Sequence, residues 1–288
     1  MDTGALHTPA AYAGYLAEQA PFLQLPQHEI TRNGETLSVQ LGRAGDYRLQ
    51  DFTDLMLVTG TLGALNLALL HAEEAKGYIL MERLRLVRYG TEHNNSTLHA
   101  AVTSTRLSGR KGQGIAHISN DAGQQLYCMT TGYHIFSTAD FARLFAQHRR
   151  VETPGMEQDT VLPAVENRYT ADPCVYRTHI APFTHRHCLG HFPGYPCVPA
   201  SFVMRCLLGG MLEWLKRYAP VSADQLVFDN VEIFTARMMP VATALAGAVQ
   251  VLHTSRRSYK FIVNLEQATD AAIIYGHYII DLQSMPLC

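Results

Sequence analysis

Four histidines lie close together in the second half of the chain: His179, His185, His187 and His191. An imidazole with its ordinary pKa near 6.5 can accept or donate a proton at neutral pH, and its neutral form is a common metal ligand. The spacing would allow zinc binding. However, no carboxylate lies near the cluster in the sequence, and a carboxylate or a carbonyl normally orients a zinc-bound histidine. We therefore expect proton transfer, with no metal and no cofactor, and keep zinc as the alternative.

The last of these histidines opens a turn rich in proline and glycine. Residues 190–199 read G-H-F-P-G-Y-P-C-V-P, and an apolar segment follows from Ala200. A turn that ends at Pro199 leaves the amide of Ala200 unpaired at the start of a helix, where negative charge is favoured. His191 and this amide could together remove a proton beside a carbonyl and stabilise the enolate that forms. The alternative is a structural histidine that satisfies buried backbone groups.

This segment resembles the G-H-F-P-G-x-P-x-x-P signature of the β-hydroxyacyl-acyl-carrier-protein dehydratases of fatty acid synthesis. The resemblance implies that His191 is the base and that the Ala200 amide polarises the thioester carbonyl. It also implies that Phe192, Gly194 and Pro199 contribute to substrate binding. The detailed likeness covers only the second half of the chain.

One position departs from the pattern of that family. The family carries a Glu or Asp 14 positions after the motif histidine, where this chain has Arg205, and a glycine where it has Ala200. Arginine keeps its proton near neutral pH and cannot act as the acid. Arg205 is either a partly exposed helix residue or a buried group that pairs with an acid or binds a substrate carboxylate or phosphate, and we assign it to substrate binding.

Two apolar segments, residues 55–72 and 201–218, are expected to be helices, and each precedes a run of strands. The expected strands cover residues 84–87, 98–107, 114–119 and 125–136 after the first helix, and 227–234, 244–254, 259–266 and 272–282 after the second. Residues 55–72 approach the length of a membrane span, but Thr59 and Asn66 interrupt them. We interpret both segments as core helices enclosed by a sheet, with no membrane partner.

The order of helix and then strands occurs twice, which predicts an internal repeat. Asp51-Phe52 matches His191-Phe192, and residues 132–135 resemble residues 276–279. A curved sheet around one apolar helix is the hotdog arrangement, and two such units can pair along their open edges. We expect an α+β double hotdog with a degenerate N-terminal unit at residues 1–155 and a C-terminal unit carrying the motif at residues 156–288. It would be a monomer or a homodimer.

The match of Asp51 with His191 would place Leu65 at the missing acid position and Asn66 beside it. Asn66 is therefore a candidate to hold a water that supplies the proton. The repeat also implies a second site, in which Asp51 takes the place of the histidine and lies opposite Arg205. We expect these two residues to form a salt bridge.

Charge and cysteine content exclude several classes of protein. The formal charge is −2, which makes nucleic-acid binding improbable. Six cysteines form no CxxC pair and indicate reduced thiols, and the N-terminus lacks the pattern of a secretory signal. We expect a cytoplasmic protein.

The sequence favours a dehydratase-like enzyme acting on 3-hydroxyacyl thioesters of an acyl-carrier protein or of coenzyme A, in fatty-acid or polyketide-type biosynthesis. Two alternatives stay open. One is a hotdog thioesterase or another enolate-chemistry enzyme, such as an isomerase, cyclase or decarboxylase. The other is a catalytically silent acyl-binding partner subunit, because no acidic residue occupies an expected acid position.

Overall fold

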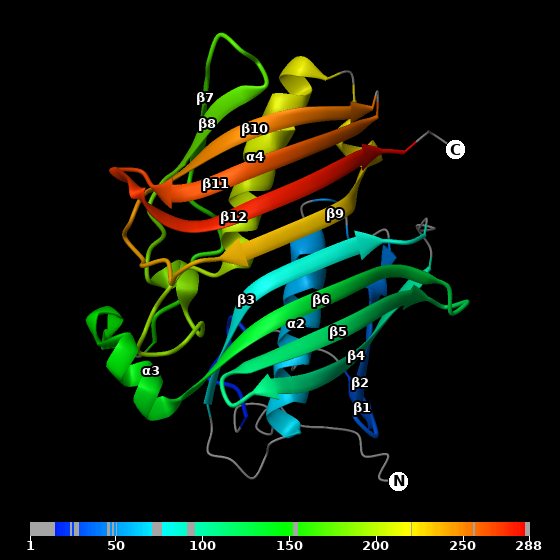
Figure 1. The fold of residues 1–288 in the computed structure, drawn as a ribbon, viewed down its shortest axis with the longest axis vertical. Helices are drawn as coiled ribbons and strands as arrows, with labels where there is room; N and C mark the ends of the chain where they lie inside the picture. Colours follow the sequence, from blue (N-terminus) through cyan, green and yellow to red (C-terminus); the bar gives the residue numbers. More distant parts are fainter. Residues whose placement is uncertain are drawn as a thin grey trace.

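The computed structural model describes residues 15–285 except positions 24, 26–28, 45–46, 48, 50, 71–76, 91–95, 152–154, 220 and 256. Its main feature is a single sheet of twelve antiparallel strands that spans both halves of the chain (Figure 1). The strands of the first half are β1 (Ile30–Asn33), β2 (Thr36–Arg43), β3 (Gly77–Arg88), β4 (Thr97–Ser108), β5 (Lys111–Asn120) and β6 (Gln125–Ser137). Those of the second half are β7 (Val165–Tyr169), β8 (Val175–Ile180), β9 (Leu226–Thr235), β10 (Leu245–Ser255), β11 (Ser258–Gln267) and β12 (Asp270–Ser284).

The strand order shows an internal duplication. It runs β1-β2-β4-β5-β6-β3-β9-β12-β11-β10-β8-β7. Read from each outer edge toward the centre, β7-β8-β10-β11-β12-β9 of the second half corresponds strand by strand to β1-β2-β4-β5-β6-β3 of the first. The halves join where β3 pairs with β9, from Arg83 opposite Phe234 to Val87 opposite Asn230. This pairing covers the edge that each half would otherwise expose. The predicted double hotdog fold is confirmed.

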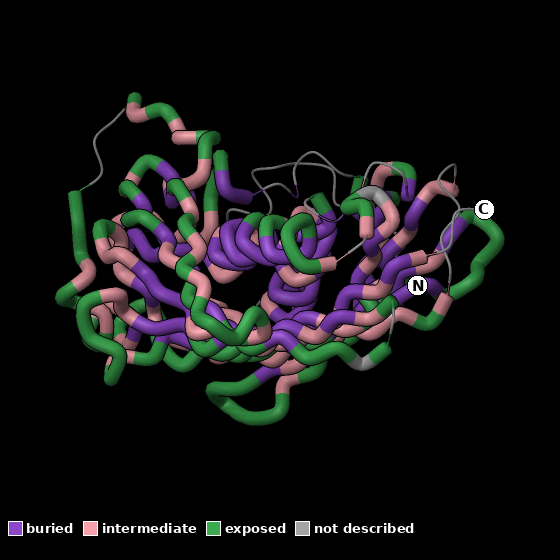
Figure 2. Tube along the Cα trace, turned by 90° about the horizontal axis from the view of Figure 1, so that it is seen from above, coloured by how far each residue is buried: buried purple, intermediate pink, exposed green. Residues whose placement is uncertain are grey.

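Each half packs one long helix against the inner face of the sheet. Helix α2 (Phe52–Leu69) belongs to the first half and α4 (Ala200–Tyr218) to the second. Figure 2 shows the buried turns of both helices lying over the buried face of the sheet. The short helix α3 (Thr138–Leu144) follows β6. Among the described residues, α2 is the one helix long and apolar enough to cross a membrane, and 72% of it is buried inside the protein.

The expected elements form with small shifts of their ends, but four strands were not predicted. The pairs β1–β2 and β7–β8 precede α2 and α4 and form the two outer edges of the sheet. The boundary expected at residue 155 lies between the 3₁₀ turn Ala146–His148 and β7, and stays a prediction. Residues 71–72 of the first expected helix lie outside the described part, as does Cys288. The other five cysteines are free.

The alignment of Asp51 with His191 is wrong. Asp51 directly precedes α2, as Pro199 directly precedes α4, whereas His191 lies further upstream in the turn. Counted from the helix starts, the residue equivalent to Arg205 is Leu57, and neither Leu65 nor Asn66 occupies the acid position. The two halves correspond at the starts of their helices, and the short sequence match at Asp51 does not follow that correspondence. The similarity of residues 132–135 to residues 276–279 does fall in equivalent strands, β6 and β12.

Two glycines of α2 offer a matched test of how the helix packs on the sheet. A Cβ atom at Gly63 would collide with the hydroxyl of Tyr133 in β6, whereas a Cβ at Gly60 would meet no atom within 4 Å. That hydroxyl donates to the carbonyl of Gly60 at 2.7 Å, which holds the ring in place. Gly63→Ala should lower the free energy of unfolding by about 1–3 kcal/mol, because the tyrosine must move.

Gly60→Ala should raise the free energy of unfolding by up to about 1 kcal/mol, because alanine favours the helix and fits without a clash. Urea denaturation of both variants beside the unchanged protein measures the difference. Equal stability of the two variants would contradict the described packing of α2.

Candidate active site

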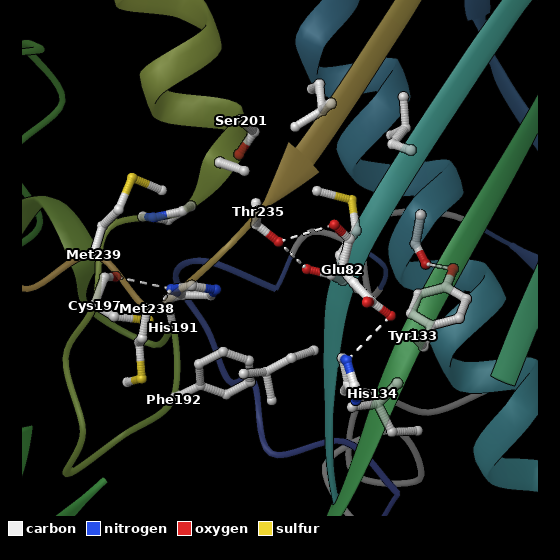
Figure 3. A pocket seen from close by; sticks show the side chains of 18 of the residues that line it. Glu82, Tyr133, His134, His191, Phe192, Cys197, Ser201, Thr235, Met238 and Met239 are labelled. Carbon is white, nitrogen blue, oxygen red and sulfur yellow. Dashed lines mark hydrogen bonds and ion pairs between the residues drawn. The ribbon is translucent and has the colours of Figure 1, made fainter. Parts of the chain in front are cut away.

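A cavity of about 450 Å³ lies where the two halves meet. Helix α2 and strands β3 and β6 supply one side, and the motif turn, the start of α4 and strand β9 supply the other (Figure 3). Most of its surface is apolar. His191, Phe192, Pro199 and Ala200 all line it, as their sequence pattern suggested. The cavity therefore draws on both halves of the duplicated chain.

The turn that carries His191 is tightly wound. Gly190 and Gly194 have φ angles of +82° and +79°, and Phe192 has φ +56°, which is unusual for a residue with a side chain. Gly194 serves this turn, its carbonyl accepting from the amide of Arg150 at 2.9 Å. It does not line the cavity, so the structure gives no support for its assignment to substrate binding.

The ring of His191 is fixed in one tautomer. Nδ1 lies 2.9 Å from the carbonyl oxygen of Cys197, which can only accept, so Nδ1 carries the proton and Nε2 keeps a free lone pair. The ring packs between Phe22 and Phe192, with centroid distances of 4.5 and 4.4 Å. Burial lowers the pKa of His191 to about 4, against the weaker opposing effect of the Cys197 carbonyl. The imidazole is therefore neutral at neutral pH and able to accept a proton.

A carboxyl group that was not predicted from the sequence faces this imidazole. Oε1 of Glu18 lies 3.9 Å from Nε2 of His191, and the side chains of His191 and Glu18 are only 11% and 15% exposed. Burial raises the pKa of Glu18 to about 7. Desolvation disfavours the charged form of each group, so it moves the two pKa values in opposite directions. Between about pH 4 and pH 7 the pair therefore holds one proton, which resides on the carboxyl.

Glu18 is held there by contact between its own segment and the motif turn. The amide of Gln19 donates to the carbonyl of Gly190 at 2.8 Å. A side chain at position 190 would collide with the backbone of Gln19 and Ala20. Gly190 thus permits the close approach that brings Glu18 to His191. One sequence signal was available: Glu18 is the only acidic residue, lysine or arginine between Asp2 and Glu29.

The start of α4 presents unpaired donors to the same cavity. Pro199 precedes the helix and makes no side-chain capping bond. The amides of Phe202 and Val203 donate to the carbonyl of Pro199, which leaves the amides of Ala200 and Ser201 at the open end of the helix. Ala200 and Ser201 both line the cavity. A carbonyl oxygen near Ala200 would meet N–H donors and the positive end of the helix dipole.

Arg205 lies away from the cavity wall and serves the contact between the two helices. Its guanidinium pairs with Asp54 of α2, and Nε donates to Oγ1 of Thr53 at 2.8 Å. Burial raises the pKa of Asp54, partly opposed by Arg205. The expected salt bridge between the halves does form, but with Asp54 rather than Asp51. Because this pair engages Arg205, the assignment of Arg205 to substrate binding is wrong.

Asn66 is also outside the cavity. Its Nδ2 donates to the carbonyl oxygens of Glu35 at 2.8 Å and Val102 at 3.0 Å, which ties α2 to β4 and to the turn between β1 and β2. The side chain is fully buried. It cannot hold a water for the chemistry at His191, so the prediction that it helps to supply the proton is wrong.

The zinc alternative finds no support in the described part of the chain, where no three His, Cys, Asp or Glu residues are grouped to hold a metal. His187 has a structural role instead: Nε2 donates to the carbonyl of Val161 at 2.8 Å, and Nδ1 accepts from the amide of Thr184 at 2.9 Å.

A second polar group in the cavity was not predicted from the sequence. Glu82 lines the opposite wall, with His134 at 3.1 Å and Lys111 at 3.5 Å from its carboxylate (Figure 3).

Glu18→Gln tests the burial of the carboxyl independently of any activity. The pKa of Glu18 is higher in the folded protein than in the unfolded chain, so the wild type loses stability as the pH rises from about 4.5 to about 7. Glutamine binds no proton in this range. The stability of Glu18→Gln relative to wild type should therefore rise by up to about 3 kcal/mol between pH 4 and pH 8 in urea unfolding.

His191→Gln should show the opposite sign. The pKa of His191 is lowered from 6.5 to about 4 in the folded protein, so the wild type gains stability relative to this variant as the pH rises from 4 to 6.5. The same urea series measures it. Stability differences that stay constant with pH for both variants would contradict the buried pair.

Comparison with solved structures places this architecture among known proteins. A putative oleoyl thioesterase from Lactobacillus plantarum is similar over 88% of this chain and 97% of its own, with a TM-score of 0.56 and 11% identity. The 12:0-ACP thioesterase from Umbellularia californica is similar over 87% and 95%, with a TM-score of 0.57 and 7% identity. The tesB protein of Mycobacterium avium subs paratuberculosis is similar over 89% and 96%, with a TM-score of 0.55 and 9% identity.

No protein-family model and no curated protein sequence matches the chain. At these identities the structural similarity establishes the fold and leaves the reaction open. The chain is a double hotdog, with a fold that it shares over most of its length with these thioesterases.

Proposed function

We propose that this protein catalyses the reversible removal of water from a 3-hydroxyacyl thioester, with His191 as the base and Glu18 as the acid. One observation carries the proposal: a largely buried carboxyl lies 3.9 Å from Nε2 of an imidazole inside an apolar cavity, where burial raises the pKa of that carboxyl to about 7. The resemblance of the motif to dehydratases left no acid at position 205. Glu18 supplies that missing group from the other end of the chain.

The first half of the reaction uses His191 and the start of α4. Nε2 of His191 takes the proton from C2 of the substrate, and the electron pair of the C2–H bond moves toward the thioester carbonyl. The amide of Ala200 stabilises the negative charge that develops on the carbonyl oxygen. Because Nδ1 donates to the Cys197 carbonyl, the imidazolium that forms stays oriented.

The second half uses Glu18. Its carboxyl gives a proton to the hydroxyl on C3, the C3–O bond breaks, and water leaves as the double bond forms between C2 and C3. Glu18 is then a carboxylate and His191 is protonated. Transfer of that proton from Nε2 to the carboxylate returns both groups to their starting forms, and their separation of 3.9 Å permits it after a small movement.

The substrate carrier is an acyl-carrier protein or coenzyme A, as the motif suggests, and both present the same pantetheine arm. The exposed side chains of Phe234 and Arg237 belong to the residues that line the cavity, which gives the arm a route inward from the surface near the end of β9. The cytoplasmic location and the monomeric or dimeric state remain predictions from the sequence.

Thioester hydrolysis is the second candidate, and the same carboxyl favours it. Above pH 7 Glu18 is a carboxylate that could activate a water molecule beside a carbonyl held at Ala200. Hydrolysis needs Glu18 to be deprotonated, whereas dehydration needs Glu18 to carry a proton beside a neutral His191. The two reactions therefore depend on pH in opposite ways.

An assay with 3-hydroxyacyl and saturated acyl thioesters of coenzyme A and of a carrier protein separates the candidates. We expect interconversion of 3-hydroxyacyl and 2-enoyl thioesters, followed by ultraviolet absorbance and mass, without release of free thiol. His191→Ala and Glu18→Gln should each lower kcat by about 100-fold or more. Glu166→Gln, which changes an exposed carboxyl on β7, is the control. Thiol release that depends on Glu18 would indicate a hydrolase, and no turnover at all would favour a silent acyl-binding subunit.

The pH dependence of kcat/KM gives a second test. Dehydration should increase as His191 loses its proton near pH 4 and decrease as Glu18 loses its own near pH 7. A rate that instead rises through pH 7 would contradict dehydration and match a carboxylate base.

A further inference from the structure

We propose that the hydroxyl of Ser201 is a second donor to the substrate's thioester carbonyl, beside the amide of Ala200. The inference rests on the proposed function for the reaction, but requires only that a thioester carbonyl binds at the start of α4. It assigns a catalytic contact to a side chain that the sequence motif does not single out.

Ser201 has a buried hydroxyl without a partner. Its Oγ is inaccessible to solvent and makes no hydrogen bond to any part of the chain that the structure describes. A hydroxyl buried in this state costs free energy, because it has lost water and gained nothing. Such a group is expected where a ligand completes the hydrogen bond.

The position of this hydroxyl distinguishes it from the other unpaired oxygens. In the described part of the chain, the buried side-chain oxygens without a partner also include Asn66 Oδ1, Tyr278 Oη and Asp281 Oδ1. None of those three residues lines the cavity, whereas Ser201 does. Figure 3 shows Ser201 on the first turn of α4 at the cavity wall, on the same side as His191 and Cys197. Ser201 is therefore the one of these four residues that lies at the cavity wall, and rotation about its χ1 would bring the hydroxyl to a bound acyl group.

The chemistry of the carbonyl gives this hydroxyl a function. A carbonyl oxygen has two lone pairs and can accept two hydrogen bonds, and it becomes more basic as an enolate forms. The Ala200 amide provides one donor, and the adjacent Ser201 hydroxyl provides the other. Because the donor is already desolvated, its interaction strengthens mainly as the charge develops. Ser201 should therefore affect kcat more than KM.

Ser201→Ala tests the inference against a matched serine elsewhere. We expect kcat to fall by about 10- to 100-fold with KM changed by less than about threefold. The variant should be as stable as the wild type or more stable, because the change removes an unsatisfied hydroxyl.

Ser104→Ala is the control. In the unchanged protein, the buried hydroxyl of Ser104 donates to the carbonyl of Gly63 at 2.8 Å, and Ser104 does not line the cavity. This control should lose stability and keep the wild-type kcat. A Ser201→Ala variant that keeps the wild-type kcat, or that loses activity only in proportion to lost folded protein, would overturn the inference.

A measurement on a bound ligand that cannot be dehydrated separates this inference from the proposed reaction. Octanoyl-pantetheine labelled with ¹³C at the carbonyl carries the arm common to both carriers and lacks the 3-hydroxyl. Its infrared carbonyl stretch should move to lower frequency when bound to the wild type, and this shift should be smaller in Ser201→Ala. Equal frequencies in the two proteins would overturn the role of Ser201. A shift that depends on Ser201 in a protein that dehydrates nothing would keep this role and refute the proposed function.

Discussion

The burial of one carboxyl and one imidazole in the same apolar cavity determines the chemistry available to this protein. Removing Glu18 and His191 from water raises the pKa of the first to about 7 and lowers that of the second to about 4. Both groups then favour their neutral forms, so between about pH 4 and pH 7 the pair holds one proton, carried by the carboxyl, and an imidazole that can accept another. In a wet site, both groups would titrate near their ordinary values and would be charged at pH 6.

Both halves of the fold contribute residues to this cavity. The C-terminal half supplies His191 on a tight turn and the donors at the start of α4. The N-terminal half supplies the cavity wall from α2, β3 and β6, and the segment before β1 supplies Glu18. The pairing of β3 with β9 and the ion pair of Arg205 with Asp54 join the halves. The N-terminal half therefore contributes to the site although it lacks the histidine motif.

Local patterns in the sequence predicted the parts of the structure that depend on neighbouring residues. The motif at residues 190–199 identified His191 and the helix start at Ala200, and long apolar segments identified both core helices. Glu18 could not be found this way, because its contact with His191 depends on a hydrogen bond between Gln19 and Gly190, which are far apart in the chain. The short edge strands were missed for a related reason. Their stability comes from pairing within a large sheet, so their own sequences carry a weak signal.

The titration of Glu18 itself tests the account most directly. Carbon-13 NMR of protein labelled at the glutamate carboxyl carbon, with Glu18→Gln to assign the signal, reports the pKa of this one group. The account predicts a carboxyl that titrates near pH 7. A Glu18 signal that titrates near 4.5 would show a solvated carboxylate at neutral pH, and would contradict its role as the proton donor.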